Sequence, residues 1–232
     1  MPLFYLKYKI LEAHRSDCIT LFGGMTEEMD KHDMGPDIQL LGRWSTVGES
    51  AGFCICESKN VKALNNWLLN WSEVATIICV PIVDDNMART IILKKIPSYN
   101  ADYTKVNSEA KDNESLYFIE YKFNENMAQE GYNAFANMSE EEDKADAGDN
   151  TCYGRWHNLG TGSGVAICSS KGEFDLYKWA YNWNGVCTCV ITPVVSDIDC
   201  RNNIKSKPDF SIKHAALMDK KGKHKKSSSW FR

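Results

Sequence analysis

The chain has 232 residues, 43% of them hydrophobic and 25% charged, and its formal net charge is −4. This composition is close to that of an average globular domain, and it excludes wholesale disorder and collagen-like sequence. No stretch approaches the roughly 20 consecutive apolar residues of a membrane-spanning helix, so we expect no membrane span. At about 150 residues per domain, the length predicts one or two domains.

The hydrophobic periodicity of the first 85 residues predicts six elements. Apolar and polar side chains alternate where a strand is predicted, and apolar side chains recur every three or four residues where a helix is predicted. In chain order the elements are a strand at Leu3–Ile10, a helix at Glu12–Met25, strands at Ile38–Ser45 and Gly52–Glu57, a helix at Val61–Trp71 and a strand at Thr76–Val83.

The same pattern occurs a second time in the chain. Gly42-Arg43-Trp44 returns 112 residues later as Gly154-Arg155-Trp156, and the match continues without a gap as far as Asp85 and Asp197. Upstream of these motifs the offset is 113, so the first strand recurs from Leu116 onward. Internal repeats of this length indicate two similar structural units.

The order strand, helix, strand, strand, helix, strand is that of a ferredoxin-like domain. The helices cover one face of such a sheet, and the other face needs a second layer, for which the other copy is the obvious candidate. We therefore predict an α+β protein in which tandem ferredoxin-like (βαββαβ) repeats pack as a pseudo-dimeric α/β barrel. The predicted boundaries are 1–93 and 115–204 for the repeats, 94–114 for a linker, and 205–232 for a basic, flexible tail.

Several of these repeated residues carry a resemblance to a known family. Tyr8-Lys9, Leu41-Gly42-Arg43-Trp44, the helix with Trp67 and Asn70-Trp71, and the ending Val80–Asp85 resemble the domain of unknown function 3303. That family is similar to the dimeric α/β-barrel, ferredoxin-like proteins. The resemblance covers both copies and implies the fold, but it implies no particular reaction, because related barrels include monooxygenases, haem-handling enzymes and plain ligand binders.

Arg43, Trp44, Arg155 and Trp156 are the candidate ligand-binding residues. An arginine beside an indole offers a planar donor group and a stacking surface to an anionic or aromatic ligand. The more ordinary interpretation is that each tryptophan fills the core and each arginine pairs with a carboxylate from the acidic segment of its own copy.

His157 is the candidate acid/base residue, because histidine titrates near neutrality and the first copy has Ser45 at this position. A solvent-facing histidine at a strand end is the more ordinary interpretation, since no acid is visibly paired with it in the sequence.

The acidic segments and the cysteines do not predict a metal site. The segments Glu27–Asp33 and Glu140–Asp146 lack the ligand spacing of a calcium loop, and we interpret them as solvated helix faces that begin at Thr26 and Ser139. Strand residues two apart are separated by nearly 7 Å, which is wide for a zinc pair, so we interpret Cys54, Cys56, Cys187 and Cys189 as small buried thiols. No cofactor is implied.

The charge of the chain is unevenly distributed. Residues 213–232 carry a net charge of +6, and the rest of the chain carries −10. The lysine-rich tail, which includes Lys220–Lys226, predicts either binding to an acidic protein partner, RNA or a membrane surface, or an unstructured solubilising tail. An acidic body predicts no specific nucleic-acid binding.

The N-terminus has no secretory signal pattern, and nine cysteines are an odd number, so we expect reduced thiols and an intracellular, soluble protein in the cytoplasm or an organelle interior.

Two functional hypotheses remain open from the sequence. The first is a small-molecule-binding or accessory protein without catalysis, in which Arg43/Trp44 and Arg155/Trp156 frame equivalent pockets. The second is a cofactor-independent enzyme of the barrel-monooxygenase type that uses His157 as its acid/base group. Because no catalytic set is complete in the sequence, the first is preferred.

Overall fold

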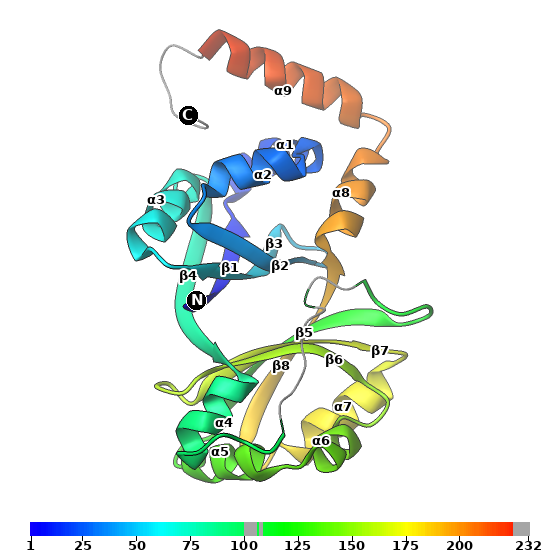
Figure 1. The fold of residues 1–232 in the computed structure, drawn as a ribbon. Helices are drawn as coiled ribbons and strands as arrows, with labels where there is room; N and C mark the ends of the chain where they lie inside the picture. Colours follow the sequence, from blue (N-terminus) through cyan, green and yellow to red (C-terminus); the bar gives the residue numbers. More distant parts are fainter. Residues whose placement is uncertain (100–105, 107–108, 225–232) are drawn as a thin grey trace. The chain divides into compact units, whose positions relative to one another are not determined.

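The computed structural model describes residues 1–99, 106 and 109–224, with side chains as far as residue 220. The chain divides into two compact units (Figure 1). Unit 1 consists of Met1–Cys79 and the chain from Val195 onward, and unit 2 consists of Val80–Val194.

Unit 1 contains a sheet with helices on one of its faces (Figure 1). Its strands are β1 (Leu3–Ile10), β2 (Ile38–Thr46), β3 (Ala51–Ser58), the first part of β4 (Ala75–Asp84) and the end of β8 (Cys187–Ser196), in the hydrogen-bonded order β4-β1-β3-β2-β8. Both β1 and β2 run antiparallel to β3. The helices are η1 (Glu12–His14), α1 (Arg15–Gly24), α2 (Glu27–Met34), α3 (Val61–Trp71), α8 (Asp197–Lys205) and α9 (Phe210–His224).

Unit 2 repeats this arrangement. Its strands are β5 (Ser115–Phe123), β6 (Thr151–Asn158), β7 (Ser163–Ser170), most of β8 and the end of β4, in the order β8-β5-β7-β6-β4. Its helices are α4 (Asp85–Leu93), α5 (Ala128–Asn137), α6 (Glu140–Ala147) and α7 (Glu173–Asn182).

Strands β4 and β8 each continue from one unit into the other. The hydrogen-bonded order of the eight strands therefore returns to its start as a closed barrel, β1-β3-β2-β8-β5-β7-β6-β4. Each repeat has the strand order of a ferredoxin-like fold, which confirms the predicted α+β class and the duplicated α/β barrel.

The local signals for helix starts are also confirmed. The Thr26 side chain accepts a hydrogen bond from the Met29 amide at the start of α2. At the start of α6, Ser139 and Glu142 form a reciprocal capping box. Because such caps satisfy amide groups that have no partner within the helix, both short acidic helices begin at defined residues.

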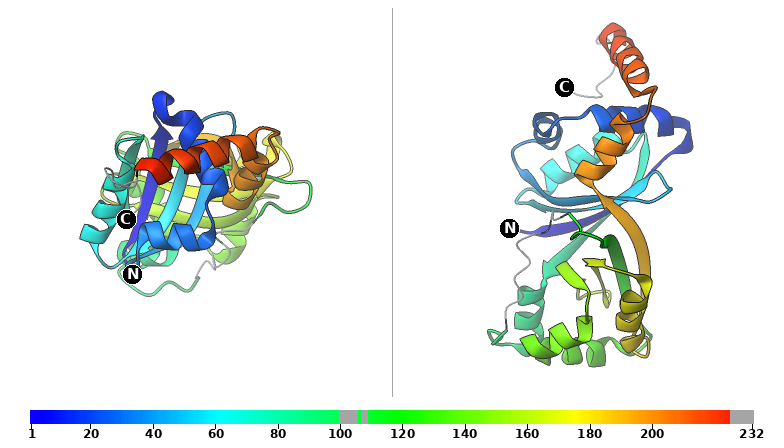
Figure 2. Two further views of the ribbon diagram at one scale, coloured as in Figure 1. Left: turned by 90° about the horizontal axis from the view of Figure 1, so that it is seen from above. Right: turned by 90° about the vertical axis from the view of Figure 1, so that its right-hand side faces the viewer.

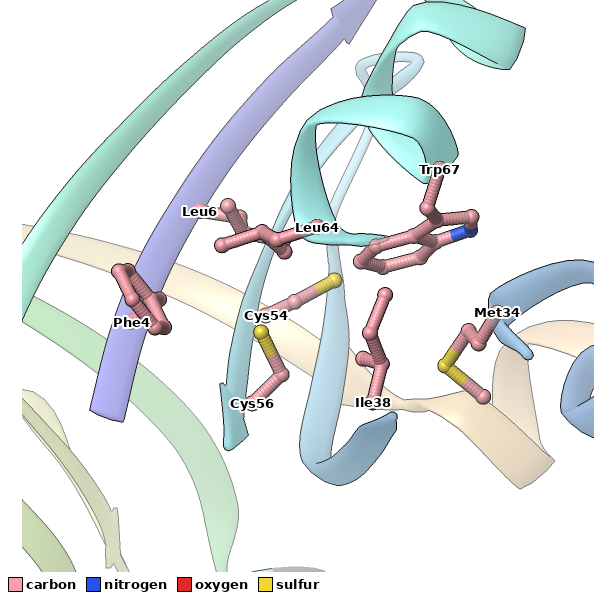
Figure 3. Close-up of a cluster of buried hydrophobic side chains, with 8 residues drawn as sticks. All are labelled: Phe4, Leu6, Met34, Ile38, Cys54, Cys56, Leu64 and Trp67. Atoms are coloured by element: carbon pink, nitrogen blue, oxygen red, sulfur yellow. The ribbon is translucent and has the colours of Figure 1, made fainter. Parts of the chain in front are cut away.

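The core of unit 1 lies between its sheet and α3 (Figure 3). Side chains from strands and helices interdigitate there, and the cluster consists of Phe4, Leu6, Met34, Ile38, Cys54, Cys56, Leu64 and Trp67. The equivalent cluster in unit 2 is smaller and contains Ile119, Ala166, Cys168 and Leu176.

The structure differs from the predicted boundaries in two places. A helix follows the last strand of each repeat, α4 after β4 and α8 after β8, and each packs in the unit formed mainly by the other repeat. Part of the tail that was expected to be flexible is helix α9, which packs against α1 and α8 on the outer side of unit 1 (Figure 2). Residues 225–232 lie outside the described residues. Within the described part of the chain, no helix is long and apolar enough to cross a membrane.

Candidate functional site

Arg43 lies in a buried cluster of charged side chains in unit 1. Its Nε donates to Asp197 Oδ1 at 2.6 Å, and its Nη2 donates to Asp30 Oδ2 at 2.8 Å. Arg201 donates to Asp30, to Asp197 and to the carbonyl of Met25. Two arginines and two aspartates thus neutralise one another, and the Phe22 ring lies 4.9 Å from the Arg43 guanidinium and 4.6 Å from that of Arg201.

Arg155 occupies the equivalent place in unit 2. Its Nε donates to Asp85 Oδ1 at 2.9 Å, and its Nη2 donates to Asp143 Oδ1 at 3.0 Å. Arg89, the counterpart of Arg201, instead donates to the Met138 carbonyl at 2.9 Å and lies 4.4 Å from the Phe135 ring. Asp30 and Asp143 come from the acidic segment of the same copy as the arginine they bind, as the ordinary interpretation expected.

The second carboxylate of each cluster comes from the other repeat. Asp197 begins α8 and binds Arg43 of the first repeat, whereas Asp85 begins α4 and binds Arg155 of the second repeat. Each repeat therefore supplies one carboxylate to the unit that is built mainly from the other repeat.

The tryptophans lie away from these arginines. Trp44 stands between Arg43 and Ser45 on β2, and because alternate strand residues point to opposite faces, it lies on the face opposite to theirs. It is 1% exposed, and its ring covers Gly42, where a side chain would overlap the indole. Trp156 covers Gly154 in the same way. The structure therefore does not bring Arg43 and Trp44, or Arg155 and Trp156, together around one pocket.

His157 is buried and hydrogen-bonded through both ring nitrogens, so the solvent-facing interpretation was wrong. Its side chain is 3% exposed, its Nε2 lies 2.7 Å from Asp85 Oδ1, and its Nδ1 lies 2.5 Å from the Tyr121 hydroxyl. The acid partner that was not visible in the sequence is Asp85, which comes from the first repeat.

The pKa shifts of this group follow from its burial and from its charged neighbours. Burial lowers the pKa of His157, and the hydrogen bond that His157 donates to Asp85 opposes this shift without cancelling it. Burial alone raises the pKa of Asp85, but Arg155 and His157 outweigh it and hold that pKa below its usual range. An ionised Asp85 accepts a hydrogen bond from Nε2–H, so Nδ1 of a neutral imidazole accepts a hydrogen bond from the Tyr121 hydroxyl.

Each unit has a cavity between its sheet and its helices. The cavity of unit 1 has a volume of about 250 Å³ and is lined by side chains of all five strands of its sheet and of α1, α3 and α8, among them Tyr8, Phe22, Arg43, Cys54, Trp67 and Ile204. The cavity of unit 2 has a volume of about 60 Å³ and is lined by residues that include Tyr121, Arg155, His157 and Trp179.

Larger side chains explain why the cavity of unit 2 is smaller. His157 replaces Ser45, Phe123 replaces Ile10, and Tyr132 replaces Ile19 at matching positions of the repeat. All three larger residues line the unit 2 cavity, and their three counterparts line the unit 1 cavity. The asymmetry therefore results from substitutions on a common framework.

A carboxylate holds the tryptophans of the helix that covers each cavity. Asp33 Oδ2 accepts from the indole nitrogens of Trp67 and Trp71 at 2.8 and 2.9 Å. In unit 2, Asp146 accepts from Trp179 and Trp183 at 2.8 and 2.7 Å. Since indole N–H groups are donors only, this arrangement fixes α3 against α2 and α7 against α6. The acidic segments are therefore only partly solvated.

The described residues contain no group of three or more His, Cys, Asp or Glu side chains that could hold a metal ion. Cys54, Cys56 and Cys187 are buried, in line with their interpretation as small apolar groups, whereas Cys189 is only partly buried. The sulfur atoms of Cys187 and Cys189 are closer than the strand spacing indicates, at 3.8 Å.

The model of the family described as a domain of unknown function (DUF3303) matches residues 2–96 and 115–207. The chain belongs to this family. It contains two DUF3303 domains, which confirms the resemblance carried by the repeated motifs. A search of curated proteins finds no match.

Solved structures with similar folds come from several organisms. A DypB variant from Rhodococcus jostii RHA1 in complex with heme has 9% identity and a TM-score of 0.47, over 86% of this chain and 94% of that one. A chlorite dismutase variant from Candidatus Nitrospira defluvii has 8% identity and a TM-score of 0.45, over 87% of this chain and 94% of that one. The encapsulated DyP-type peroxidase from Mycobacterium smegmatis has 8% identity and a TM-score of 0.44, over 86% of this chain and 94% of that one. At these identities, the function has to be argued from the chain's own site.

Four charged residues of the two DUF3303 domains were missed as site residues. Asp85 and Asp197 match across the repeat, but the sequence pattern predicted only that each follows the last strand of its repeat, not that it contributes to a site. Arg89 and Arg201 also match at the offset of 112. That match, one helical turn beyond each aspartate, was the signal available for α4 and α8.

Proposed function

We propose that the protein binds a small, largely apolar molecule in the cavity of unit 1. The volume of about 250 Å³ is larger than the roughly 150 Å³ of an engineered apolar cavity that binds benzene. Most of its lining is aliphatic or aromatic, with a few polar groups, which is the usual composition of a small-molecule site. This cavity is the observation that carries the proposal.

The charge of the cavity wall supports an apolar ligand. Arg43 lines the cavity, but its guanidinium is already bound by Asp30 and Asp197, and the side chain is only 10% exposed. With Arg201 included, the cluster has no net charge. Of the four predicted ligand-binding residues, the proposal therefore assigns Arg43 to the wall of the site and not to recognition of an anion.

Ser50 supports a polar group on the ligand. Its hydroxyl is buried, lines the cavity and has no hydrogen-bond partner among the described residues. Burying an unpaired hydroxyl costs about 1–3 kcal/mol. A ligand with a donor or acceptor at this end of the cavity would remove that cost.

The test is the binding of naphthalene, measured by saturation-transfer NMR. We expect binding to the wild-type protein and to Cys54→Ala, and its loss in Cys54→Phe, because a phenyl group at position 54 fills the cavity. Cys79→Phe is the matched control, since Cys79 is exposed and does not line the cavity. Far-UV circular dichroism checks that each variant folds. Equal binding to Cys54→Phe and Cys79→Phe would contradict the proposal.

The second candidate is the enzyme hypothesis, and the chain of hydrogen bonds from Asp85 through His157 to Tyr121 favours it. A carboxylate that orients an imidazole is a common arrangement for moving a proton. The cavity of about 60 Å³ beside His157 counts against a large substrate. Oxygen uptake with a dihydroxybenzene is the test: this hypothesis expects uptake above autoxidation that His157→Ala abolishes and Ser45→Ala retains. Equal uptake by the wild type and His157→Ala would exclude it.

A further inference from the structure

A second hollow adjoins the cavity of unit 1. It has a volume of about 310 Å³ and lies among η1, α1, α8 and the start of α9. Ile19, Ile204 and Lys207 line both spaces, so the second hollow lies directly beside the cavity, on the side where α1 faces α8. We call this hollow the mouth of the cavity.

The mouth is polar and carries a net positive charge. Arg15, Lys207 and Lys213 line it, together with the acidic residues Glu12 and Asp209. Arg15 lies 3.5 Å from Glu12, and Lys213 lies 2.6 Å from Asp209. Among the described residues Lys207 forms no ion pair, and its charge acts on Asp209 from farther away. The cation that borders both the mouth and the apolar cavity is therefore the one that can take a new anionic partner.

The mouth depends on a part of the chain that has no counterpart in the first repeat. Phe210 and Lys213 belong to α9, and Lys207 and Asp209 belong to the segment between α8 and α9. After the equivalent helix α4, the described residues of 94–114 contain no helix. Within the described part of the chain, the cavity of unit 2 therefore has no counterpart of the α9 wall of the mouth.

We infer that the ligand of unit 1 is an anionic amphiphile, with its apolar part in the cavity and a carboxylate or similar head group at Lys207. This inference rests on the proposed function and adds the class of ligand to it. An apolar body gains free energy from burial, while a charged head group stays at the mouth, where water still reaches it and no charge has to be desolvated. The neutral cluster around Arg43 leaves no uncompensated charge deeper in the cavity to attract the head group.

The experiment compares probes of equal chain length by isothermal titration calorimetry at pH 7.5. The probes are decanoate, decan-1-ol and decylammonium, and the protein is the full chain. We expect decanoate to bind more tightly than decan-1-ol, and decylammonium to bind most weakly. Increasing salt should weaken decanoate binding and leave decan-1-ol binding unchanged, because salt screens exposed charges.

Lys207→Glu is the decisive variant, and Lys205→Glu is its matched control. Both lysines are exposed, but Lys205, on α8, lines neither the mouth nor the cavity. Reversing one charge at the mouth should weaken decanoate binding about three- to tenfold, with decan-1-ol binding unchanged. Lys205→Glu should bind decanoate as the wild type does.

The outcomes separate this inference from the proposed function. Two results would overturn the recognition of an anionic head group by Lys207 and leave the apolar site standing. One is equal affinity for decanoate and decan-1-ol, and the other is equal affinity of Lys207→Glu and Lys205→Glu for decanoate. If none of the probes binds, and naphthalene does not bind either, the proposed function itself fails.

Discussion

At the scale of the residue, one substitution distinguishes the two copies most clearly. Ser45 and His157 occupy the same position of the repeat, but His157 reaches both Asp85 and the Tyr121 hydroxyl. The imidazole also lies 4.5 Å from the Phe135 ring, so it is enclosed by apolar as well as polar groups. This environment favours the neutral form, because a charged imidazole would have to be desolvated.

The buried His157 predicts a loss of stability at mildly acidic pH. An unfolded histidine titrates near pH 6.5, whereas burial lowers the pKa of His157 in the folded protein. As the pH falls below about 6.5, the unfolded chain binds a proton that folded His157 does not, so the free energy of unfolding decreases. Urea midpoints measured at pH 7.5 and 5.5 should show this decrease in the wild type.

His157→Gln provides the control for that measurement. Glutamine does not titrate, so the difference between the two midpoints should shrink in this variant, while all other titrating groups remain. If the wild type and His157→Gln lose the same stability between pH 7.5 and 5.5, the folded His157 is not the neutral group that we describe.

At the scale of the element, helices α4 and α8 connect each repeat to the unit formed by the other. Each begins with an aspartate, capped by Asp84 in α4 and by Ser196 in α8. That aspartate meets the arginine of the strand on which the helix packs, β6 for α4 and β2 for α8. The packing of α4 and α8 in the unit of the opposite repeat thus depends on ion pairs that are largely removed from water.

Asp197→Asn should destabilise unit 1, although residue 197 belongs to the second repeat. Removing one partner of a buried ion pair leaves the other charge uncompensated, and we expect a cost of about 3 kcal/mol, the low end of the range, because Asp197 is partly exposed. Hydrogen exchange followed by mass spectrometry should show faster exchange in α2 and β2, with unit 2 unchanged. Asp85→Asn should give the reverse pattern. Faster exchange in both units from either variant would contradict the separate clusters.

At the scale of the whole molecule, neither repeat contains all the parts of one unit. Residues 1–99 include Arg43 and Asp30 but lack Asp197 and Arg201, and they carry Asp85 and Arg89 on a helix whose partner is in the second repeat. Because α4 and α8 are equivalent helices of similar repeats, α4 of one fragment molecule can pack where α8 packs in the full chain, on β2 of a second fragment molecule.

A fragment of residues 1–99 should therefore be a dimer in solution. Its Asp85 would bind Arg43 of a second copy and complete both clusters at once. Light scattering coupled to size-exclusion chromatography should give the mass of a dimer for the fragment, and Asp85→Asn should shift it toward an unfolded monomer. A folded monomeric fragment would contradict this account of how the units are completed.

The elements of both repeats could be predicted from the sequence because their causes are local. Alternation predicted β1 at its observed bounds, apolar spacing predicted α3, and the hydroxyl residues Thr26 and Ser139 predicted the starts of α2 and α6. The predicted helix at Glu12–Met25 is a short 3-10 helix followed by α1. The matching offsets predicted the duplication, and with it the ferredoxin-like strand order.

The chemistry of the site could not be predicted in the same way, because it depends on residues that are distant in the chain. Arg43 and Asp197 are separated by 154 positions, and His157 and Asp85 by 72. Whether an arginine is free or paired, and whether a histidine is buried, depends on which helix packs against its strand.

The sequence by itself determined that two copies of one βαββαβ pattern follow each other, since periodicity and caps act within a few residues. Only the tertiary structure decided that the arginines are neutralised by aspartates of the opposite repeat, that His157 is held in a buried chain of hydrogen bonds, and that the cavity of unit 1 is the larger one. These properties arise where side chains from several elements compete for the same space and the same hydrogen-bond partners, and that competition is settled only when the chain has folded.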